Sequence, residues 1–412
     1  MTTTKNNEHK KLNVPNKREQ NQTCLDSAER EGLRPKGNVP TLRFPEFQGE
    51  WEELGLSELL DFKNGLNPKP DKFGKGIKFI SVMDILNNAV ITYDCIKASV
   101  DVTEKELADF SVEKGDILFQ RSSETLEDVG RANVYMDDKT AVFGGFVIRG
   151  KKKGEYDPQY FNYLLRSPFA RKRIIPMGAG AQHFNIGQEG LSKVKLHFAN
   201  IEEQKKIGKM LSLLDERIST QNKIIDKLQS LIKGLRVRLI QIENGNIVHL
   251  GEIARIYQPQ TISSTELTED GFLVYGANGI IGKYKEYNHK TEQICITCRG
   301  NTCGMVNYTK PMSWITGNAM VINTDEHQNK VCKRYLYHFL SAYNFNSLIS
   351  GSGQPQIVRT PLEQLKVTLP TFLEQKQKAT FLDKIQGKTE ICNKTLNLYL
   401  QQKQYLLRQM FI

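Results

Sequence analysis

The sequence predicts an α+β fold in which two similar globular domains are each followed by a long helix. Three observations predict this class: a motif order that recurs after roughly 171 to 175 residues, two stretches with a sustained 3-4 spacing of apolar residues, and period-two strand patterns between them. At 412 residues the chain is also too long for one ordinary core. We therefore expect a pseudo-two-fold internal repeat.

The repeat is visible as the same succession of short motifs in each half of the chain. The first copy contains Tyr160–Leu165, the glycine-rich patch Gly178–Gln182, then Leu191–Phe198 and Glu203–Lys205. The second copy contains Tyr335–Leu340, Gly351–Gln354, Leu362–Leu369 and Glu374–Lys376. In both copies, a mixed globule precedes a helical pattern.

The two helical patterns predict a seam of packed helices, because a 3-4 spacing places apolar residues on one face. The seam residues are Leu211, Leu214, Ile218, Ile225, Leu228, Ile232 and Leu235 in the first pattern and Leu382, Ile385, Leu396 and Leu406 in the second. Helices of this length would reach on the order of 50 to 60 Å. We expect the two to pair antiparallel within the chain as a coiled coil; the alternative is a coiled coil that makes a homodimer.

Within the globules, several local patterns predict individual elements. Period-two stretches predict strands at Ile294–Thr297 and Ala319–Ile322, with a turn at Gly300-Asn301. Asp157-Pro158 is typical of a helix start, with Asp as the N-cap and Pro in the first turn, and predicts a helix through Leu165.

Composition excludes some classes of protein. No apolar run approaches the roughly 18 residues that a membrane span needs, and the first residues lack the apolar core of a secretory signal. We therefore expect a cytoplasmic protein without membrane contact, whose seven cysteines are reduced thiols. The net charge of +11 favours a polyanionic partner but does not prove one.

Three near-motifs for catalysis or metal binding are weak. Asp157–Tyr160 differs by one letter from the Asp-Pro-Pro-Tyr signature of amino-methyltransferases, but it is explained by the helix cap. Gly276–Lys283 has the wrong glycine spacing for a phosphate loop and better fits a hairpin. Cys295, Cys298 and Cys303 lack the remaining ligands of a zinc site. We therefore predict no catalytic residue and no metal site.

A repeated basic and amide-rich set is the better candidate site. Glycine allows close backbone approach, Arg and Lys hold phosphates, and Gln and Asn can pair with adenine in the major groove. For any single residue the alternative is a solvated loop side chain. The predicted DNA-binding residues are Arg121, Ser122, Arg171, Lys172, Arg173, Gln182, His183 and Asn185 in the first half, and Asn278, Arg299, Asn301, Thr302, Gln354, Gln356 and Arg359 in the second. Arg121 and Arg299 are expected at matching strand ends.

Taken with Pro40–Phe47, which reads Pro-Thr-Leu-Arg-Phe-Pro-Glu-Phe, and with Trp51, the two Glu-Gln-Lys helix openings resemble the specificity subunit of type I restriction-modification systems. The resemblance covers roughly residues 40 to 412. It implies two target-recognition domains that each read half of a bipartite site in double-stranded DNA. It also implies two helices that dock two modification (methyltransferase) subunits, in a complex with two restriction (motor and endonuclease) subunits.

The same resemblance implies that this chain is not an enzyme and holds no cofactor. S-adenosylmethionine, ATP and Mg are expected in the partner subunits. The predicted domains are a disordered or adaptor segment at 1–38, the first recognition domain at 39–199, the first spacer helix at 200–245, the second recognition domain at 246–370 and the second spacer helix at 371–412.

Two other functions stay open at this point. A stand-alone DNA methyltransferase or nuclease with fused recognition domains would need a cofactor loop or a set of metal-binding carboxylates. A two-helix scaffold without a nucleic-acid role is the third possibility.

Overall fold

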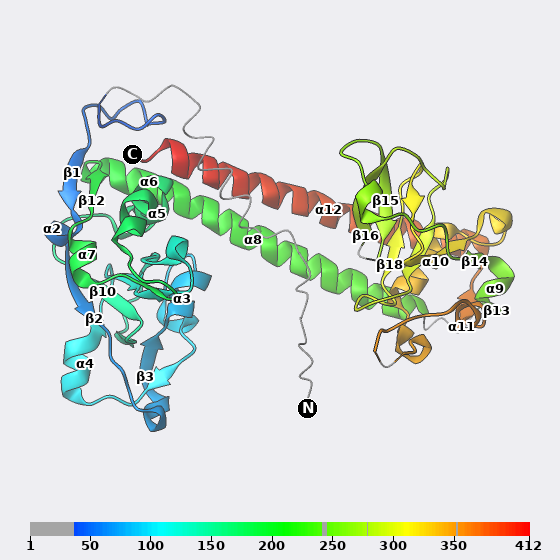
Figure 1. Cartoon of the computed structure of the whole chain (residues 1–412), viewed down its shortest axis with the longest axis horizontal. Coiled ribbons are helices and arrows are strands. Elements are labelled where there is room, and N and C mark those ends of the chain that lie inside the picture. Colours follow the sequence, from blue (N-terminus) through cyan, green and yellow to red (C-terminus); the bar gives the residue numbers. More distant parts are fainter. Residues whose placement is uncertain (1–36, 241–244, 278, 352) are drawn as a thin grey trace, which may run out of the picture. The chain divides into compact units, whose positions relative to one another are not determined.

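A computed structural model describes residues 37–240, 245–277, 279–351 and 353–412. The chain divides into two compact units, each containing parts of both long helices (Figure 1). Unit 1 comprises Met1–Ser219 and Asn397–Ile412, and unit 2 comprises Thr220–Leu396. The predicted disordered or adaptor segment at 1–38 lies, up to residue 36, outside the described residues.

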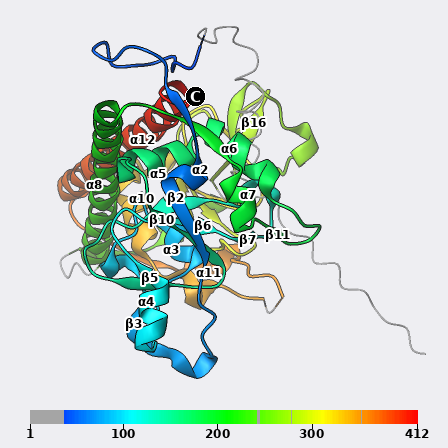
Figure 2. The same ribbon diagram turned by 90° about the vertical axis from the view of Figure 1, so that its left-hand side faces the viewer.

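In the residues that the structure describes, unit 1 contains two four-stranded sheets. The central sheet has the antiparallel order β2-β10-β6-β8, formed by Leu60–Asn64, Val147–Lys152, Ile117–Gln120 and Ala132–Val134 (Figure 2). The other has the order β4-β3-β9-β5, formed by Ser99–Val100, Phe73–Ile80, Ala141–Phe143 and Ser111–Val112. Strands β1 (Glu52–Gly55) and β12 (Lys195–Phe198) pair separately, as do β7 (Ser122–Ser123) and β11 (Phe184–Asn185).

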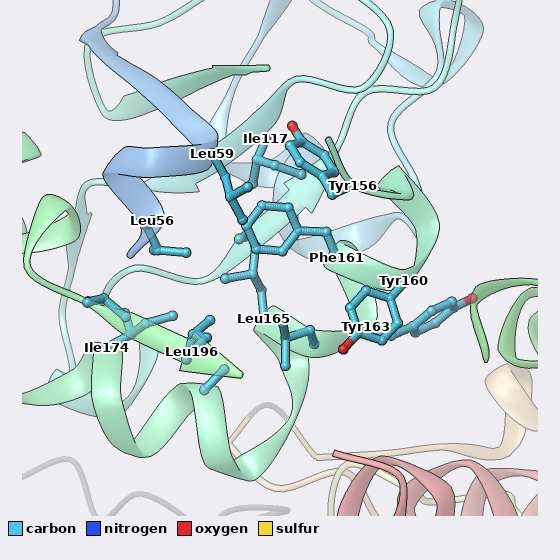
Figure 3. Packing of buried hydrophobic residues seen from close by; sticks show 14 of the residues in the cluster. Leu56, Leu59, Ile117, Tyr156, Tyr160, Phe161, Tyr163, Leu165, Ile174 and Leu196 are labelled. Atoms are coloured by element: carbon cyan, nitrogen blue, oxygen red, sulfur yellow. The ribbon is translucent and has the colours of Figure 1, made fainter. Parts of the chain in front are cut away.

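Helix α5 (Pro158–Arg166) provides the main apolar face of unit 1. Its start is as predicted, because the Asp157 carboxylate accepts a hydrogen bond from the backbone N–H of Tyr160 at 2.8 Å. Tyr160, Phe161 and Leu165 then pack in the core (Figure 3). The chain's C-terminus joins this core, since the buried ring of Phe411 lies 5.5 Å from that of Tyr160. The unit's shorter helices are α2 (Leu56–Leu59), α3 (Val82–Asn87), α4 (Glu104–Phe110), α6 (Pro168–Ile174) and α7 (Gln188–Ser192).

Unit 2 repeats the core topology of unit 1. Its central sheet has the order β14-β20-β17-β18, formed by Arg255–Tyr257, Ala319–Asn323, Ile294–Thr297 and Val306–Tyr308. A second sheet, β16-β15-β19, contains Gly279–Tyr284, Phe272–Gly276 and Trp314–Ile315, and β13 (Asn246–His249) pairs with β21 (Lys366–Leu369). Its helices are α9 (Leu250–Ile253), α10 (Lys333–Ala342) and α11 (Arg359–Glu363). The matching strand orders confirm the predicted repeat, the two predicted strands and the β15–β16 hairpin.

The long helices α8 (Ile201–Ile240) and α12 (Phe372–Gln409) pack antiparallel within each unit. In unit 1 the Asp215 carboxylate is 2.5 Å from Nζ of Lys403. In unit 2 Nε2 of Gln221 donates to the carbonyl of Cys392 at 3.0 Å, and Nη2 of Arg236 donates to Gln386 at 3.0 Å. All the predicted seam residues are buried or half-buried. The pairing is therefore within the chain, as the sequence predicts.

The repeated Glu-Gln-Lys motif joins the start of each long helix to the globule before it. Gln204 is buried, accepts a hydrogen bond from the N–H of Asp157 at 2.9 Å and donates to the carbonyl of Ala199 at 2.8 Å. Gln375 is also buried and accepts from the N–H of Cys332 at 2.9 Å. Asp157 and Cys332 are the N-cap residues of α5 and α10, so each glutamine fixes a helix start against the neighbouring long helix.

Candidate nucleic-acid interface

At one end of the central sheet of unit 1, segments distant in sequence meet; we call this end the loop edge of unit 1. The N–H of Arg121, just after β6, donates to the carbonyl of Phe146, just before β10, at 2.9 Å. On its other side, Arg121 accepts a hydrogen bond from the N–H of Ile186 at 2.9 Å. Ser122 is paired with Asn185 through β7 and β11. The sheet thus brings Arg121, Ser122 and Asn185 of the predicted set together.

A glycine-dependent hairpin forms part of this loop edge. Ala179 and Asn185 exchange two backbone hydrogen bonds, and Gly180 between them has φ of +142°. A Cβ atom at Gly180 would lie 2.0 Å from the carbonyl oxygen of His183, so only glycine fits. The hairpin leaves the predicted residues Gln182, His183 and Asn185 exposed.

Unit 2 has the same arrangement, which we call the loop edge of unit 2. The N–H of Cys298 donates to the carbonyl of Asn318, and the N–H of Ile357 donates to the carbonyl of Cys298, both at 3.0 Å. Ser350 and Gln356 exchange two hydrogen bonds around a second hairpin. Gly351, at φ of +95°, takes the place of Gly180, because a Cβ atom there would lie 2.5 Å from the carbonyl of Gln354.

These hydrogen bonds correct the expected match of the two arginines. Arg121 corresponds to Cys298, because the backbone of each makes the same two hydrogen bonds. Each N–H donates to the turn before the neighbouring strand, β10 or β20, and each carbonyl accepts from the isoleucine that follows the glycine hairpin. Arg299 pairs with Gln356, so its counterpart is Ser122, which pairs with Asn185. Because side chains of a strand alternate between its faces, a shift by one residue sends the two arginines to different faces.

Their surroundings differ accordingly. Arg121 is half-buried, and its Nη1 donates to the carbonyl of Gly145 at 3.4 Å. Arg299 is exposed, and among the described residues its side chain has neither a hydrogen bond nor an ion pair. It lines a hollow together with Tyr257, Gln258, Met320, Gln356, Ile357, Val358 and Arg359. Three of the predicted residues therefore converge on this hollow in unit 2.

The three basic residues of α6 divide between internal and external roles. Nη2 of Arg171 donates to the carbonyls of Glu127 and Val129 at 2.9 and 2.6 Å, and burial lowers its pKa to about 10. Arg171 therefore supports the loop before β8. Arg173 and Lys172 are exposed, and Arg173 lies 3.3 Å from Glu53.

The other predicted residues of unit 2 that the structure describes lie on the same loop edge. Asn301 and Gln354 are exposed, while Thr302 is half-buried and donates to the carbonyl of Ala277 at 3.1 Å. Arg359 forms an ion pair with Glu363 at 2.6 Å, which partly neutralises the charge of the arginine. Asn278 lies outside the described residues.

The structure adds four residues that the sequence did not single out as candidates. Asn64 is the last residue of β2, and Gln258 directly follows β14, the first strand of the other central sheet. Nε2 of Gln258 donates to Sγ of Cys298 at 3.1 Å. Phe146 and Asn318 are the single exposed residues of the two turns before β10 and β20. No local motif marks them, but the repeat would have been a signal once the strands were aligned.

Two further observations concern other chemistry. In the part of the chain that the structure describes, no three His, Cys, Asp or Glu side chains are grouped so that they could hold a metal ion. Cys295 and Cys298 pack in different apolar clusters of unit 2. None of the described helices has the length and apolar character to cross a membrane.

Comparisons with known proteins agree on one family. The profile of the family described as type I restriction modification DNA specificity domain matches residues 48–230 and 243–400. A Methanocaldococcus jannaschii protein assigned as the MjaX type I restriction enzyme specificity subunit is 26% identical over 395 residues, covering 87% of this chain and 92% of that protein.

Solved structures share the fold. The crystal structure of a type I restriction-modification S subunit from M. genitalium has a TM-score of 0.64 and 19% identity, and covers 91% of this chain and 99% of that chain. A chain from a structure that describes complex assembly and conformational transition of the type I R-M system has a TM-score of 0.54 and 14% identity, and covers 87% of this chain and 96% of that chain.

Proposed function

This chain belongs to the specificity subunits of type I restriction-modification systems, and from this premise we propose that it binds a bipartite target in double-stranded DNA with one half-site for each unit. The target-recognition domains are residues 39–199 and 246–370, and 200–245 and 371–412 are the spacer helices. The chain itself is non-catalytic. Modification and restriction subunits, two of each, supply methyl transfer and ATP-driven cleavage.

The observation that carries the proposal is the loop edge, which occurs once in each unit. Two copies of one backbone arrangement that present different side chains are what two half-sites of different sequence require. The exposed Arg299 supports this proposal, because a side chain that has neither a hydrogen bond nor an ion pair within the described part of the chain can contact a phosphate or a guanine. The net charge of +11 acts in the same direction by attracting duplex DNA.

Docking of the modification subunits is supported by apolar side chains that the helix seam leaves uncovered. On α12 of unit 2, Phe381 is 56% exposed and Ile391 is 64% exposed. On α12 of unit 1, Leu398 is 63% exposed. Large apolar side chains that stay exposed on helices that are already paired support docking of a further protein.

Methylation mapping tests the DNA part of the proposal. The chain would be expressed with the modification subunit from the same cell, and methylated adenines would be mapped across the genome. We expect one target of two defined half-sites separated by a spacer, and no methyl transfer by the chain alone with a labelled donor. A single uninterrupted target, or methyl transfer without a partner, would contradict the proposal.

Docking has a separate test. Ile391→Glu and Leu398→Glu would each be co-purified with the modification subunit, with Asn397→Glu as the matched control at an exposed polar position of the same helix. We expect both apolar substitutions to weaken co-purification and the control to leave it unchanged. If all three variants retain the partner equally, the partner binds elsewhere.

A further inference from the structure

The two turns that precede β10 and β20 present one exposed side chain each at the centre of a loop edge. In unit 1, Phe146 is 68% exposed, whereas Gly145 before it is half-buried and Val147 after it is buried. In unit 2, Asn318 is exposed between the buried Gly317 and Ala319. A single exposed residue in a turn whose other residues are buried or half-buried is positioned to contact an external partner.

Both turns are held firmly by backbone hydrogen bonds. In unit 1, the N–H of Val147 donates to Gly144 at 2.8 Å, and the N–H of Arg121 donates to Phe146 at 2.9 Å. In unit 2, the N–H of Ala319 donates to Thr316 at 3.0 Å. The second turn also accepts the hydrogen bond from Cys298, so position 318 is the structural counterpart of position 146.

The neighbours of these residues are those that a DNA contact needs. The carbonyl of Phe146 accepts from Arg121, and the next residue along, Ser122, pairs with the exposed Asn185. The carbonyl of Asn318 accepts a hydrogen bond from the N–H of Cys298, which precedes the exposed Arg299. Through the backbone, Phe146 is therefore bonded to Arg121, and Asn318 is bonded to the residue before Arg299. Arginine can hold a phosphate or read a guanine.

The chemistry of the two projecting side chains is different. A phenylalanine side chain that is 68% exposed leaves a large apolar surface in contact with water unless a partner covers it. In the major groove, the apolar group that DNA offers is the 5-methyl group of thymine. The Asn318 amide has no hydrogen-bond partner among the described residues, and asparagine pairs with N6 and N7 of adenine in the same groove.

We infer that positions 146 and 318 determine specificity: Phe146 contacts a thymine methyl group in one half-site, and Asn318 pairs with an adenine in the other. This inference rests on the proposed function, because it requires that each loop edge meets duplex DNA. Beyond the proposed function, it names the base that one residue of each unit selects. Both side chains project from rigid turns, so replacing them leaves the core intact.

Modified bases test the contacts directly. The complex of the chain with its modification subunit would be bound to target duplexes in which uracil replaces each thymine in turn, or 7-deazaadenine replaces each adenine. At one thymine, loss of the methyl group should weaken binding of the unsubstituted complex about fourfold, and Phe146→Ala should remove this sensitivity. At one adenine, loss of N7 should weaken binding roughly 5- to 100-fold, and Asn318→Ala should remove that sensitivity.

Matched controls are Met83→Ala, an exposed apolar residue of unit 1, and Asn329→Ala, an exposed amide of unit 2. Both should keep the sensitivity of the unsubstituted complex. Methylation mapping of Phe146→Asn should also show a change at one position of one half-site, with the other half-site unchanged.

The outcomes separate this inference from the proposed function. If both alanine variants keep the same target and the same sensitivity to modified bases, positions 146 and 318 do not select bases, although the chain can still recognise DNA. Uniform weakening on all duplexes would likewise overturn the inference. A complex without any sequence preference would overturn the proposed function and this inference with it.

Discussion

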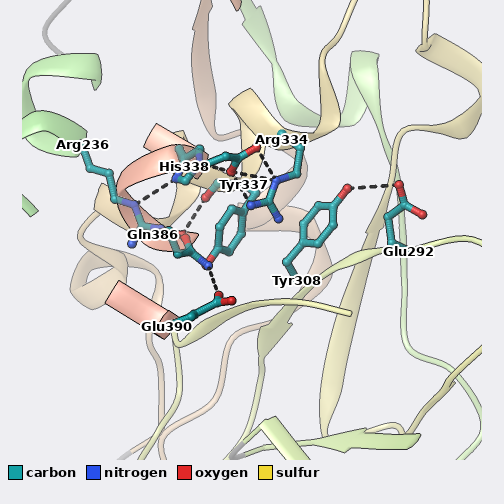
Figure 4. Close-up of polar contacts among 10 residues, drawn as sticks. Arg236, Glu292, Tyr308, Arg334, Tyr337, His338, Gln386 and Glu390 are labelled. Carbon is teal, nitrogen blue, oxygen red and sulfur yellow. Dashed lines mark hydrogen bonds and ion pairs between the residues drawn. The ribbon is translucent and has the colours of Figure 1, made fainter. Parts of the chain in front are cut away.

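Replacing Asp383 of α12 with Asn is expected to destabilise unit 2, because this carboxylate belongs to a polar network that joins three helices. Figure 4 shows its members Arg236, Arg334 and His338. The Asp383 carboxylate accepts a hydrogen bond from Nε of Arg334 at 2.9 Å and lies 2.8 Å from Nε2 of His338, both on α10. Nε of Arg236 on α8 donates to Nδ1 of His338 at 3.1 Å. Since Nδ1 must accept, the proton of the buried imidazole is on Nε2 and points to Asp383.

The magnitude follows from the pKa of Asp383. Partial burial acts to raise that pKa, but the hydrogen bonds from His338 and Arg334 outweigh burial and lower it to about 2 from 3.8. After a discount for solvent screening, because 32% of the side chain is exposed, the lowered pKa corresponds to about 2 kcal/mol of folding free energy at pH 7. A carboxylate with a lowered pKa stabilises the fold fully above pH 4, and the stabilisation is lost as the pH falls through 2. At pH 3 about 1 kcal/mol should remain.

The two tryptophans provide an assay for each unit, because Trp51 lies in unit 1 and Trp314 in unit 2. In a Trp51→Phe background, urea unfolding followed by Trp314 fluorescence reports on unit 2. Asp383→Asn should lower the free energy of unfolding by about 2 kcal/mol at pH 7, and the difference should be halved at pH 3. Asp270→Asn, at a fully exposed carboxylate of the same unit, is the control and should change stability by less than about 0.5 kcal/mol. Equal effects of the two substitutions, or a difference that is the same at both pH values, would refute the reasoning.

Three further predictions concern single residues. If the Arg299 side chain reads a base, Arg299→Ala should weaken DNA binding by roughly 1 to 3 kcal/mol at one base pair; if it holds a phosphate, the slope of log affinity against log salt concentration should fall by about one. Titrations at several salt concentrations distinguish the two. No change in either quantity would mean that Arg299 is a solvent-exposed side chain without a DNA contact. Gly351→Ala should weaken binding to the half-site of unit 2, since the new Cβ atom would meet the carbonyl of Gln354, whereas Gly353→Ala meets nothing within 4 Å and should bind normally. Phe411→Ala should destabilise unit 1 by about 3 to 5 kcal/mol, measured by Trp51 fluorescence, because it empties a buried aromatic site.

The sequence predicts the features of the fold that depend on periodicity or on a fixed motif order. A 3-4 spacing must place Leu211 and Leu382 on the faces of their helices that become buried, and both are buried. Asp157-Pro158 starts a helix for local reasons, and no distant contact changes that. The hairpins are predictable as glycine-rich patches because Gly180 and Gly351 satisfy a backbone requirement that is written in the sequence itself.

The sequence does not reveal which residues lie side by side at a sheet edge, because that depends on strand register. Matching Arg121 with Arg299 by letter is wrong by one position, and a single position reverses the face of a strand. Phe146 and Asn318 belong to turns far along the chain from their neighbours, so no short motif contains them. Their environment becomes visible only when the hydrogen bonds between strands are known.

The repeat separates residues that hold the backbone from residues that project from it. Positions that fix the backbone have the same residue type in both units. Gly180 and Gly351 stand at equivalent turns, and the buried Gln204 and Gln375 make equivalent hydrogen bonds. Projecting positions differ in residue type, since Phe146 is replaced by an amide. Exposed substitutions of this kind change stability by about 0.5 kcal/mol or less, whereas one changed base contact is worth roughly 1 to 3 kcal/mol. The loop edge can therefore acquire a new half-site without a new fold, and the two units can read different sequences on one scaffold.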